Sequence, residues 1–455
     1  MIRDRVVQAT AAALMLAGFV WLGYFTVRTN FLQVFSLFLI LFALYALVLW
    51  RKPFFKNIWM ALCLALLFRL ALLFMMPNLT DDYFRFIWDG LFVANGSNPY
   101  LTLPSAYIHG TPLSVPGTSL FLYGRLNSPD YYSVYPPVCQ YIFGLTAKIC
   151  GADIFWNVVM IRIFVLLSEC GSMALLYKIA RQLNAPVNNI LIYAFNPLVI
   201  IELTGNLHPE AFMIFFLLMA IYLLMRDRQI LSSLSIGLAV GAKLVPLIFL
   251  PLLIKRLGLV KSLKYFAIAG ATTILLFLPF ISLQSISHFI TGLSLYFKVF
   301  EFNTSIYYIA RWIGYWITGY NVIVFSGIFL AIISLLAIII ISYREKMLTW
   351  TSLFSHMLFC ATVYLLFATT VHPWYLTPLI AISVFSRYKY AVAWSLLIAL
   401  SYSAYQTLPY SENLWLVAIE YVLLGIWIIC EILTKRAQVL PVKEADCVAK
   451  QDDSM

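Results

Sequence analysis

The chain has 455 residues, of which 63% are hydrophobic and only 11% are charged. Its mean hydropathy is +0.91, and apolar runs long enough to cross a hydrocarbon core recur along it, which excludes a soluble globular protein. The formal net charge of +11 does not indicate a nucleic-acid partner, because the basic residues occupy alternate short loops. The composition therefore predicts an all-α integral membrane protein that crosses the bilayer many times.

The first apolar run, residues 8–27, is long enough to span a membrane and lacks a clear small-residue cleavage site, so we expect a retained helix rather than a signal peptide. With the N-terminus inside, the basic loops mark the cytoplasmic side, as the positive-inside rule requires. These loops carry Arg3/Arg5, Arg51/Lys52/Lys56, Lys178/Arg181, Arg226/Arg228, Lys255/Arg256/Lys261/Lys264, Arg344/Lys346, Arg387/Lys389 and Lys435/Arg436. We expect the bacterial inner (plasma) membrane as the location.

Residues 58–76 then run outward, and residues 77–153 form one large external loop. Counting 136–150 as a crossing would invert every later loop, and this segment is shorter than the usual span, so we expect a helix in the outer interface. Residues 305–316 predict a second interfacial helix. Residues 231–254 are too few for two full crossings and contain Pro246 and Pro251, which predicts short or discontinuous helices.

The remaining apolar runs complete a bundle of about 12–14 transmembrane helices. The later spans are predicted at 154–180, 188–204, 211–225, 262–281, 321–342, 351–371, 374–385, 390–407 and 414–433. Gly237 and Gly241 form a GxxxG pattern typical of close helix packing. The seven cysteines form no CxxC pair and are interpreted as packing residues. We expect one polytopic domain over residues 1–434 and a disordered cytoplasmic tail over 435–455.

Charge gathers directly after the outward run, where Asp81, Asp82, Arg85 and Asp89 fall within nine positions. In a chain so poor in charge, this indicates a site rather than a solvated surface. In a helix, Asp82, Arg85 and Asp89 share one face. The structural alternative is a helix start in which Thr80 or Asp81 is the N-cap. Asp82 has no such role, and a carboxylate beside apolar surface can have a pKa raised toward the range of a general base.

Six short motifs occur in order along the chain. They are the segment 80–90, NGSNPY at 95–100, YPP at 135–137, NPL at 196–198 with HPE at 208–210, the Lys-and-Pro segment 243–251, and HPWY at 372–375. This series resembles the GT-C glycosyltransferases, specifically glycosyltransferase family 87 and the polyprenyl-phosphate-mannose-dependent mannosyltransferases. The resemblance covers roughly residues 81–375. It departs at Glu210, where many relatives carry an Asp.

The resemblance implies an inverting glycosyltransferase that moves a hexose, with mannose as the expected sugar, from a polyprenyl phosphate to a glycan or glycolipid acceptor on the periplasmic or extracellular face. The sequence agrees with a lipid-borne donor, because it has neither GxGxxG nor a Walker-type loop. Asp82 is the expected base, with Asp81 as the second candidate. Arg85 and Lys243 are expected to hold the donor phosphate. The sequence shows no required cofactor, and a divalent metal is unsupported because no spacing fixes a geometry.

A further set of polar residues is expected near the acceptor: His372, Tyr375, His208, Glu210 and Asp89. Each has a structural alternative. His208 and Glu210 lie at a helix mouth where Pro209 starts the next helix, so capping alone explains them. The aromatic residues after His372 also suit an interfacial belt. Lys243 could snorkel or pair with a carboxylate.

Four charges fall inside predicted spans: Arg69, Arg162, Glu169 and Glu202. An Arg162–Glu169 pair along one helix would be a structural tie, and a functional role is equally open. Two other functions also remain. A transporter or flippase of lipid-linked sugars suits the many spans and the broken helices, and a lipid-linked oligosaccharide polymerase or ligase would need much the same site.

Overall fold

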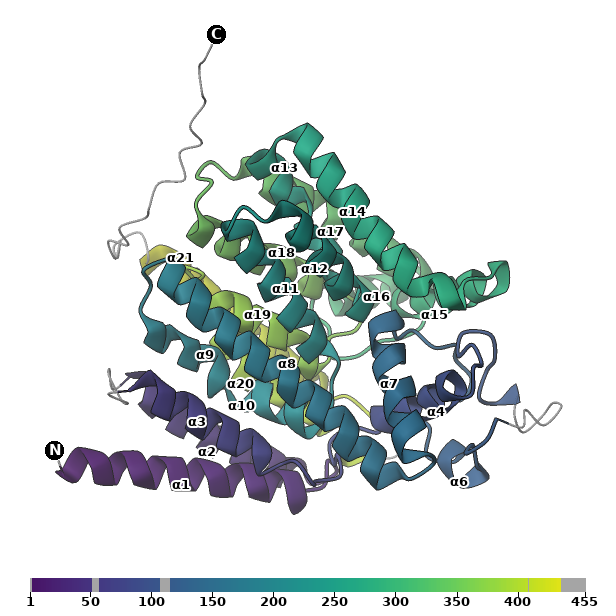
Figure 1. The fold of residues 1–455 in the computed structure, drawn as a ribbon, viewed down its shortest axis with the longest axis horizontal. Helices are drawn as coiled ribbons and strands as arrows, with labels where there is room; N and C mark the ends of the chain where they lie inside the picture. The colour runs from purple at the N-terminus through teal and green to yellow at the C-terminus, as the bar shows by residue number, and fades with distance from the viewer. Residues whose placement is uncertain (1, 51–56, 107–114, 408, 435–455) are drawn as a thin grey trace, which may run out of the picture.

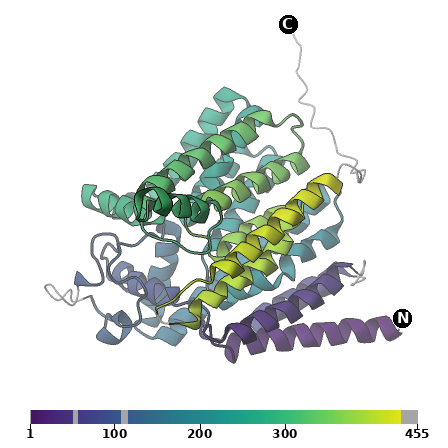
Figure 2. The same cartoon turned by 180° about the vertical axis from the view of Figure 1, so that it is seen from behind.

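The computed structural model describes residues 2–50, 57–106, 115–407 and 409–434, and the described residues form helices with no β-strand (Figures 1 and 2). The N-terminal half contains α1 (Ile2–Tyr24), α2 (Phe31–Trp50), α3 (Ile58–Leu70), α4 (Asp82–Ala94), α6 (Leu120–Tyr123), α7 (Pro137–Cys150), α8 (Ile154–Gln182), η1 (Val187–Ile190), α9 (Leu191–Ala194), α10 (Pro197–Val199), η2 (Ile200–Gly205) and α11 (Glu210–Met225). The rest contains α12 (Gln229–Ala242), η3 (Val245–Phe249), α13 (Pro251–Leu257), α14 (Leu259–Phe277), η4 (Leu278–Phe280), α15 (Leu283–Lys298), α16 (Ile306–Thr318), α17 (Ile323–Arg344), α18 (Trp350–Phe367), η5 (Pro373–Leu376), α19 (Thr377–Ser383), α20 (Tyr390–Leu397), η6 (Ile398–Gln406) and α21 (Leu414–Thr434).

The polytopic all-α membrane fold is confirmed. Seven described helices, α1, α2, α8, α14, α17, α18 and α21, are long and apolar enough to cross a membrane, or eight spans if a bent pair is included. Three shorter apolar helices, α3, α11 and α12, add to them. Fewer helices meet the length criterion than the 12–14 expected, because several predicted spans are short or broken.

The bent pair replaces the single span predicted at 188–204. Its two halves meet at 51°, and the break is at Asn196, whose side chain accepts hydrogen bonds from the Leu198 and Val199 amides. Pro197 has no amide hydrogen to continue the preceding helix. The second half consists of α10 and η2, and η2 is a π-helix, a geometry found frequently at functional sites.

The segment after α11 forms two short helices, as predicted. α12 ends at Ala242, and α13 begins at Pro251 after a 3-10 turn. Gly237 packs against α14, where an added Cβ would lie 2.8 Å from the Ala269 carbonyl oxygen, so the GxxxG glycine permits close helix packing. This packing holds the end of α12, and with it Lys243, against the bundle.

The predicted interfacial helices are present as short helices. α7 and α16 agree with the predicted segments within two residues, and α4 packs against α7 at the end of the molecule opposite the N-terminus (Figure 1). α15 was not predicted. Its start carries a Ser282–Ser285 capping box, in which Ser285 takes the place of the usual Glu or Gln.

The charges inside the bundle pair differently from the prediction. Glu169 pairs with Arg69, with 2.9 Å between nitrogen and oxygen and both side chains fully buried. Arg162 donates instead to the carbonyls of Leu73, Thr204 and Gly205. An Arg162–Glu169 tie is therefore wrong, because seven residues separate the two by about 10 Å along the helix axis.

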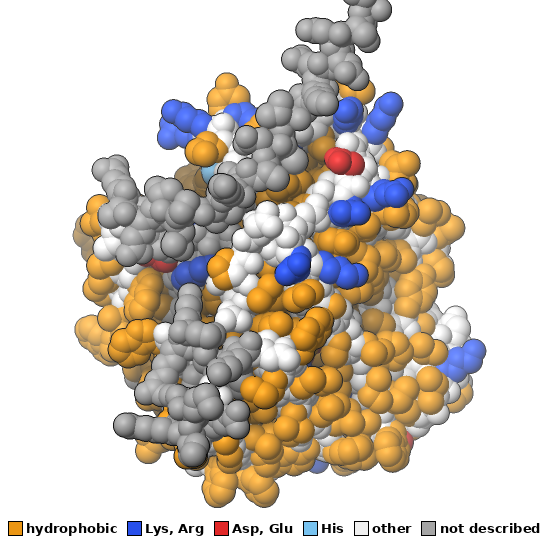
Figure 3. All heavy atoms as spheres, turned by 60° about the vertical axis from the view of Figure 1, so that its left-hand side comes forward, with side chains coloured by type: hydrophobic (Ala, Val, Ile, Leu, Met, Phe, Trp, Pro, Cys, Tyr) orange, Lys and Arg blue, Asp and Glu red, His pale blue; other side chains and the backbone are white. Residues whose placement is uncertain are grey.

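The opposite end of the bundle carries the basic residues. Figure 3 looks toward this end and shows Lys and Arg side chains gathered with few acidic ones. The predicted basic loop at 51–56, the side chains of Arg3 and Arg5, and the predicted tail 435–455 lie outside the described residues. The chain is thus a multi-pass membrane protein with a charge asymmetry between its two ends.

Candidate active site

The two adjacent aspartates at the start of α4 have different partners. Asp81 occupies the N-cap position but makes no capping bond, and its carboxylate pairs with Arg28 from the α1–α2 connection. The Thr80 hydroxyl accepts from the Asp82 amide at 3.2 Å, so Thr80 and not Asp81 supplies a cap-like bond. Arg28 also lies 5.2 Å from the ring centre of Tyr405. Asp81 is therefore engaged in a partly exposed ion pair.

Asp82 is the first residue of α4, where the helix dipole favours a carboxylate. One oxygen accepts from the Asn127 amide at 2.6 Å, and the other lies 3.9 Å from Nε2 of His208. Its side chain is 20% exposed. Burial raises the pKa of Asp82 above its ordinary value, although His208 and Asn127 act in the opposite direction. The carboxylate is thus held, accessible and more basic than usual.

Arg85 and Asp89, one turn apart, form a buried network of their own. The guanidinium donates to Asp89 at 2.8 Å and to the carbonyls of Ser128 and Tyr131. Asp89 also accepts from Ser133 and from Gln140. Arg85 is only 3% exposed and is paired with Asp89, which favours a structural role over the expected contact with the donor phosphate. The pair ties the loop before α7 to α4, and Asp89 is 1% exposed and occupied by Arg85, Ser133 and Gln140.

His208 lies in the tight link between η2 and α11. Leu207 before it adopts a φ of +67°, which is rare for a residue with a side chain. Nδ1 of His208 contacts the Glu202 carbonyl at 2.9 Å and its carboxylate at 3.1 Å, which leaves Nε2 on the Asp82 side. Burial alone would lower the pKa of His208, but Glu202, Glu210 and Asp82 together raise it. The geometry therefore favours an imidazolium beside Asp82.

A column of stacked rings continues from His208. The ring centres of His208 and Trp374 are 3.8 Å apart, those of Trp374 and His372 are 4.4 Å apart, and Phe302 covers the far side of His372 at 4.7 Å. Burial lowers the pKa of His372 to about 3, and the charges of His208 and Lys243 act in the same direction. His372 is consequently neutral and part of an aromatic wall.

Lys243 completes the cluster from the end of α12. Its ammonium group pairs with Glu210 and lies 4.1 Å from the ring centre of Tyr375. Glu210 is 1% exposed, whereas Lys243 is 27% exposed. The cation therefore has one fixed counter-ion, one aromatic neighbour and an open side. Among the described residues, no group of three His, Cys, Asp or Glu side chains is placed to hold a metal ion.

The comparison with protein families shows which family the chain belongs to. The model described as alpha-(1->6)-mannopyranosyltransferase, N-terminal domain, matches residues 5–257. The chain belongs to this mannosyltransferase family. A search of curated proteins finds no match.

The matched part of this mannosyltransferase ends with α13 and includes Asp82, His208, Glu210 and Lys243. The segment with His372 and Tyr375 lies beyond it. A single cluster thus combines residues from the matched segment with a later segment, and the fold joins them through the His208–Trp374 stack.

Several residues of this mannosyltransferase cluster were not predicted from the sequence: Arg28, Asn127, Glu202 as a partner of His208, Phe302 and Trp374 as a stacking ring. Arg28 had a usable signal, because it is a basic residue in a loop expected to lie outside, where such residues are scarce. Asn127 had none, since its role depends on a loop position that only the fold defines.

Proposed function

We propose that the protein transfers mannose from a polyprenyl-phosphate donor to a glycan or glycolipid acceptor on the non-cytoplasmic face of the membrane. The observation that carries the proposal is the Asp82–His208 pair at the partly exposed start of α4. It provides a carboxylate of raised basicity beside a cation, in a chain of the mannosyltransferase family. A carboxylate so placed suits a general base.

The face is inferred from the distribution of charge. The described basic loops gather at the end that Figure 3 displays, and the positive-inside rule assigns such an end to the cytoplasm. Asp82 is the first residue of α4, so the cluster of Asp82, His208, Glu210 and Lys243, called the Asp82 cluster, belongs to the other end, where α4 and α7 lie (Figure 1). Cytosolic nucleotide sugars do not reach that side, which supports a sugar carried by a lipid.

The proposed reaction is a direct displacement. The acceptor hydroxyl gives its proton to Asp82 while its oxygen forms a bond to the anomeric carbon of mannose. The bond between that carbon and the phosphate oxygen breaks, and its electron pair stays on the polyprenyl phosphate. Lys243 and the His208 imidazolium offset the charge of the departing phosphate. Displacement in one step inverts the anomeric configuration, in line with the resemblance.

Purified protein in lipid nanodiscs tests the proposal with polyprenyl-phosphate-[14C]mannose or GDP-[14C]mannose and a mannose-containing acceptor. We expect product from the lipid donor alone. Asp82→Asn is expected to lower kcat by about 100-fold or more, and Asp81→Asn, which removes the same charge one residue away, to stay within about threefold of wild type. Full activity of Asp82→Asn would overturn the assignment of the base. Movement of the donor across sealed vesicles without covalent product would instead indicate a transporter.

A further inference from the structure

The basic end of the bundle, away from the Asp82 cluster, contains an open hollow. Basic residues line this hollow, and it has no part in the proposed reaction. Its volume is about 930 Å³, and it is lined by Lys255, Tyr343, Arg344, Glu345, Lys346 and Leu348. These residues belong to the ends of α13 and α17 and to the link before α18. Because α14, α17 and α18 are long and apolar enough to span, the hollow lies at the level where spanning helices begin and end, at the membrane surface.

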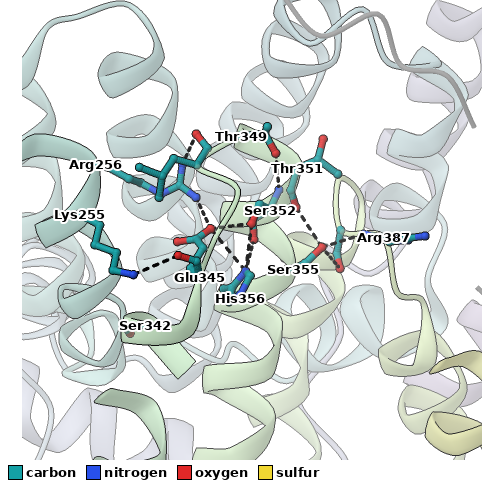
Figure 4. A network of polar contacts seen from close by, with 12 residues as sticks. Lys255, Arg256, Ser342, Glu345, Thr349, Thr351, Ser352, Ser355, His356 and Arg387 are labelled. Atoms are coloured by element: carbon teal, nitrogen blue, oxygen red, sulfur yellow. Dashed lines mark hydrogen bonds and ion pairs between the residues drawn. The ribbon is translucent and has the colours of Figure 1, made fainter. Parts of the chain in front are cut away.

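The only acid in the lining is neutralised from inside the protein. Glu345 is fully buried and pairs with Arg256, and it also accepts from Ser352 at 2.6 Å. His356 lies 3.4 Å from the same carboxylate oxygen. Figure 4 shows Arg256, Ser352 and His356 turned toward Glu345. Glu345 therefore has little charge left to offset the cations of the hollow.

The three cations of the lining are exposed. Lys255 donates to the carbonyls of Tyr343 and Glu345 and lies 4.8 Å from the ring centre of Tyr343. Among the described residues, none of the ion pairs includes Lys255, Arg344 or Lys346. The hollow thus presents three positive charges without a carboxylate counter-ion.

Exposed apolar side chains lie on the elements that form the hollow and on the neighbouring α14. Tyr343 is 77% exposed and Met347 is 67% exposed, and on the neighbouring α14 Val260 and Leu263 are also exposed. α13 packs against both α14 and α17, so these exposed apolar residues belong to elements that adjoin the hollow. A free phosphate would use only the cations, whereas a phospholipid would place its phosphate among them and its acyl chains against these side chains.

We propose that this hollow is a binding site for the headgroup of an anionic phospholipid, with Arg344 and Lys346 as its main phosphate contacts. Lys255 orders the turn through the two carbonyls and adds the third charge. Basic pockets between transmembrane helices at the cytoplasmic surface are suited to such headgroups. The site is separate from the Asp82 cluster, and its occupant is a lipid of the surrounding bilayer rather than a substrate.

The test uses the full chain in phosphatidylcholine nanodiscs that contain a minority of phosphatidylglycerol, with the phosphatidylglycerol that survives detergent extraction counted by native mass spectrometry. Arg344→Gln/Lys346→Gln is the variant, because no hydrogen bond or ion pair of either side chain is seen in the described structure. We expect about 30-fold weaker retention than in wild type. Arg226→Gln/Arg228→Gln is the matched control, since it removes two exposed charges around the end of α11 on the same face. The control is expected to retain lipid as wild type does.

Three results would overturn the proposal. Equal retention in the variant and wild type would remove the hollow as a site. Equal loss in variant and control would reduce the effect to general attraction between a basic surface and an anionic bilayer. Excess inorganic phosphate could also release the retained phosphatidylglycerol. If phosphate then raised the unfolding temperature in pure phosphatidylcholine as much as phosphatidylglycerol does, the hollow would be a site for a free anion.

Discussion

Nε2 of His208 lies 3.9 Å from a carboxylate oxygen of Asp82, and His208 is itself held through Nδ1 by Glu202. The imidazole thus has a fixed acid on one side and the proposed base on the other. In this arrangement Glu202 stabilises the positive charge of the His208 ring, and that charge in turn affects the pKa of Asp82. The first prediction follows from this relationship.

Replacement of His208 by Gln should move the acid limb of the kcat/KM profile to higher pH. The positive ring lowers the pKa of Asp82, so its removal leaves that pKa higher, and the base is ionised only at higher pH. We expect a shift of about one pH unit. The pH profile of mannosyl transfer between pH 4 and pH 9 measures it.

His372→Gln is the control for this prediction. His372 stacks on the same tryptophan but is neutral, since burial lowers its pKa to about 3. Its replacement should change the rate without moving the acid limb. An unmoved limb in His208→Gln, or an equal shift in both variants, would contradict the coupling.

Lys243→Gln should raise the KM for the lipid donor by about tenfold, since a cation for the donor phosphate is lost. The variant should also be less stable by about 1–3 kcal/mol, because Glu210 would remain buried without its counter-ion. Glu210→Gln combined with Lys243→Gln separates the two effects. The double variant should recover the unfolding temperature but not the KM. Recovery of both would make the ion pair purely structural.

Arg85→Gln should act on the fold and not on donor binding. Its loss leaves Asp89 buried with only Ser133 and Gln140 as partners, so we expect destabilisation of about 3–5 kcal/mol. The KM for the donor should be unchanged in the folded fraction. Arg125→Gln, an exposed arginine over Phe84 and Phe121, is the comparison and should change stability little. A selective rise in KM for Arg85→Gln would restore the phosphate role.

The membrane fold could be predicted from the sequence because its signal is local. α8 and α21 are long apolar runs, and their predicted bounds agree with the structure within two residues. The break at Asn196 was missed although Asn196-Pro197 is a turn signal, since an apolar run continues on both sides of it. Whether the segment crosses straight or bent depends on tertiary packing.

The chemistry of the site could be predicted only in part. A dense run of charge after a span located Asp81 and Asp82, but the choice between them depends on Arg28 and His208, which come from distant segments. The same holds for Arg85, whose partners Ser128 and Tyr131 lie in a loop. Helical spacing defines a shared face, but it does not say which side chains of other segments meet that face.

Asp82→Asn should stabilise the protein while it slows mannosyl transfer. The folded-state pKa of Asp82 is raised by burial, so the folded protein binds this proton more tightly than the unfolded chain does. The corresponding stability is fully present below the ordinary pKa of an aspartate and is lost as pH rises through the raised value. At pH 8 the ionised carboxylate is therefore a cost that asparagine does not carry, and Asn127 can still donate to its oxygen. We expect an unfolding temperature about 1–3 °C above wild type at pH 8 and a smaller difference at pH 5.

Asp81→Asn, which removes an exposed pair with Arg28, should show no such pH dependence. A lower unfolding temperature for Asp82→Asn at pH 8 would mean that this carboxylate contributes to the fold rather than costing stability for the sake of the reaction.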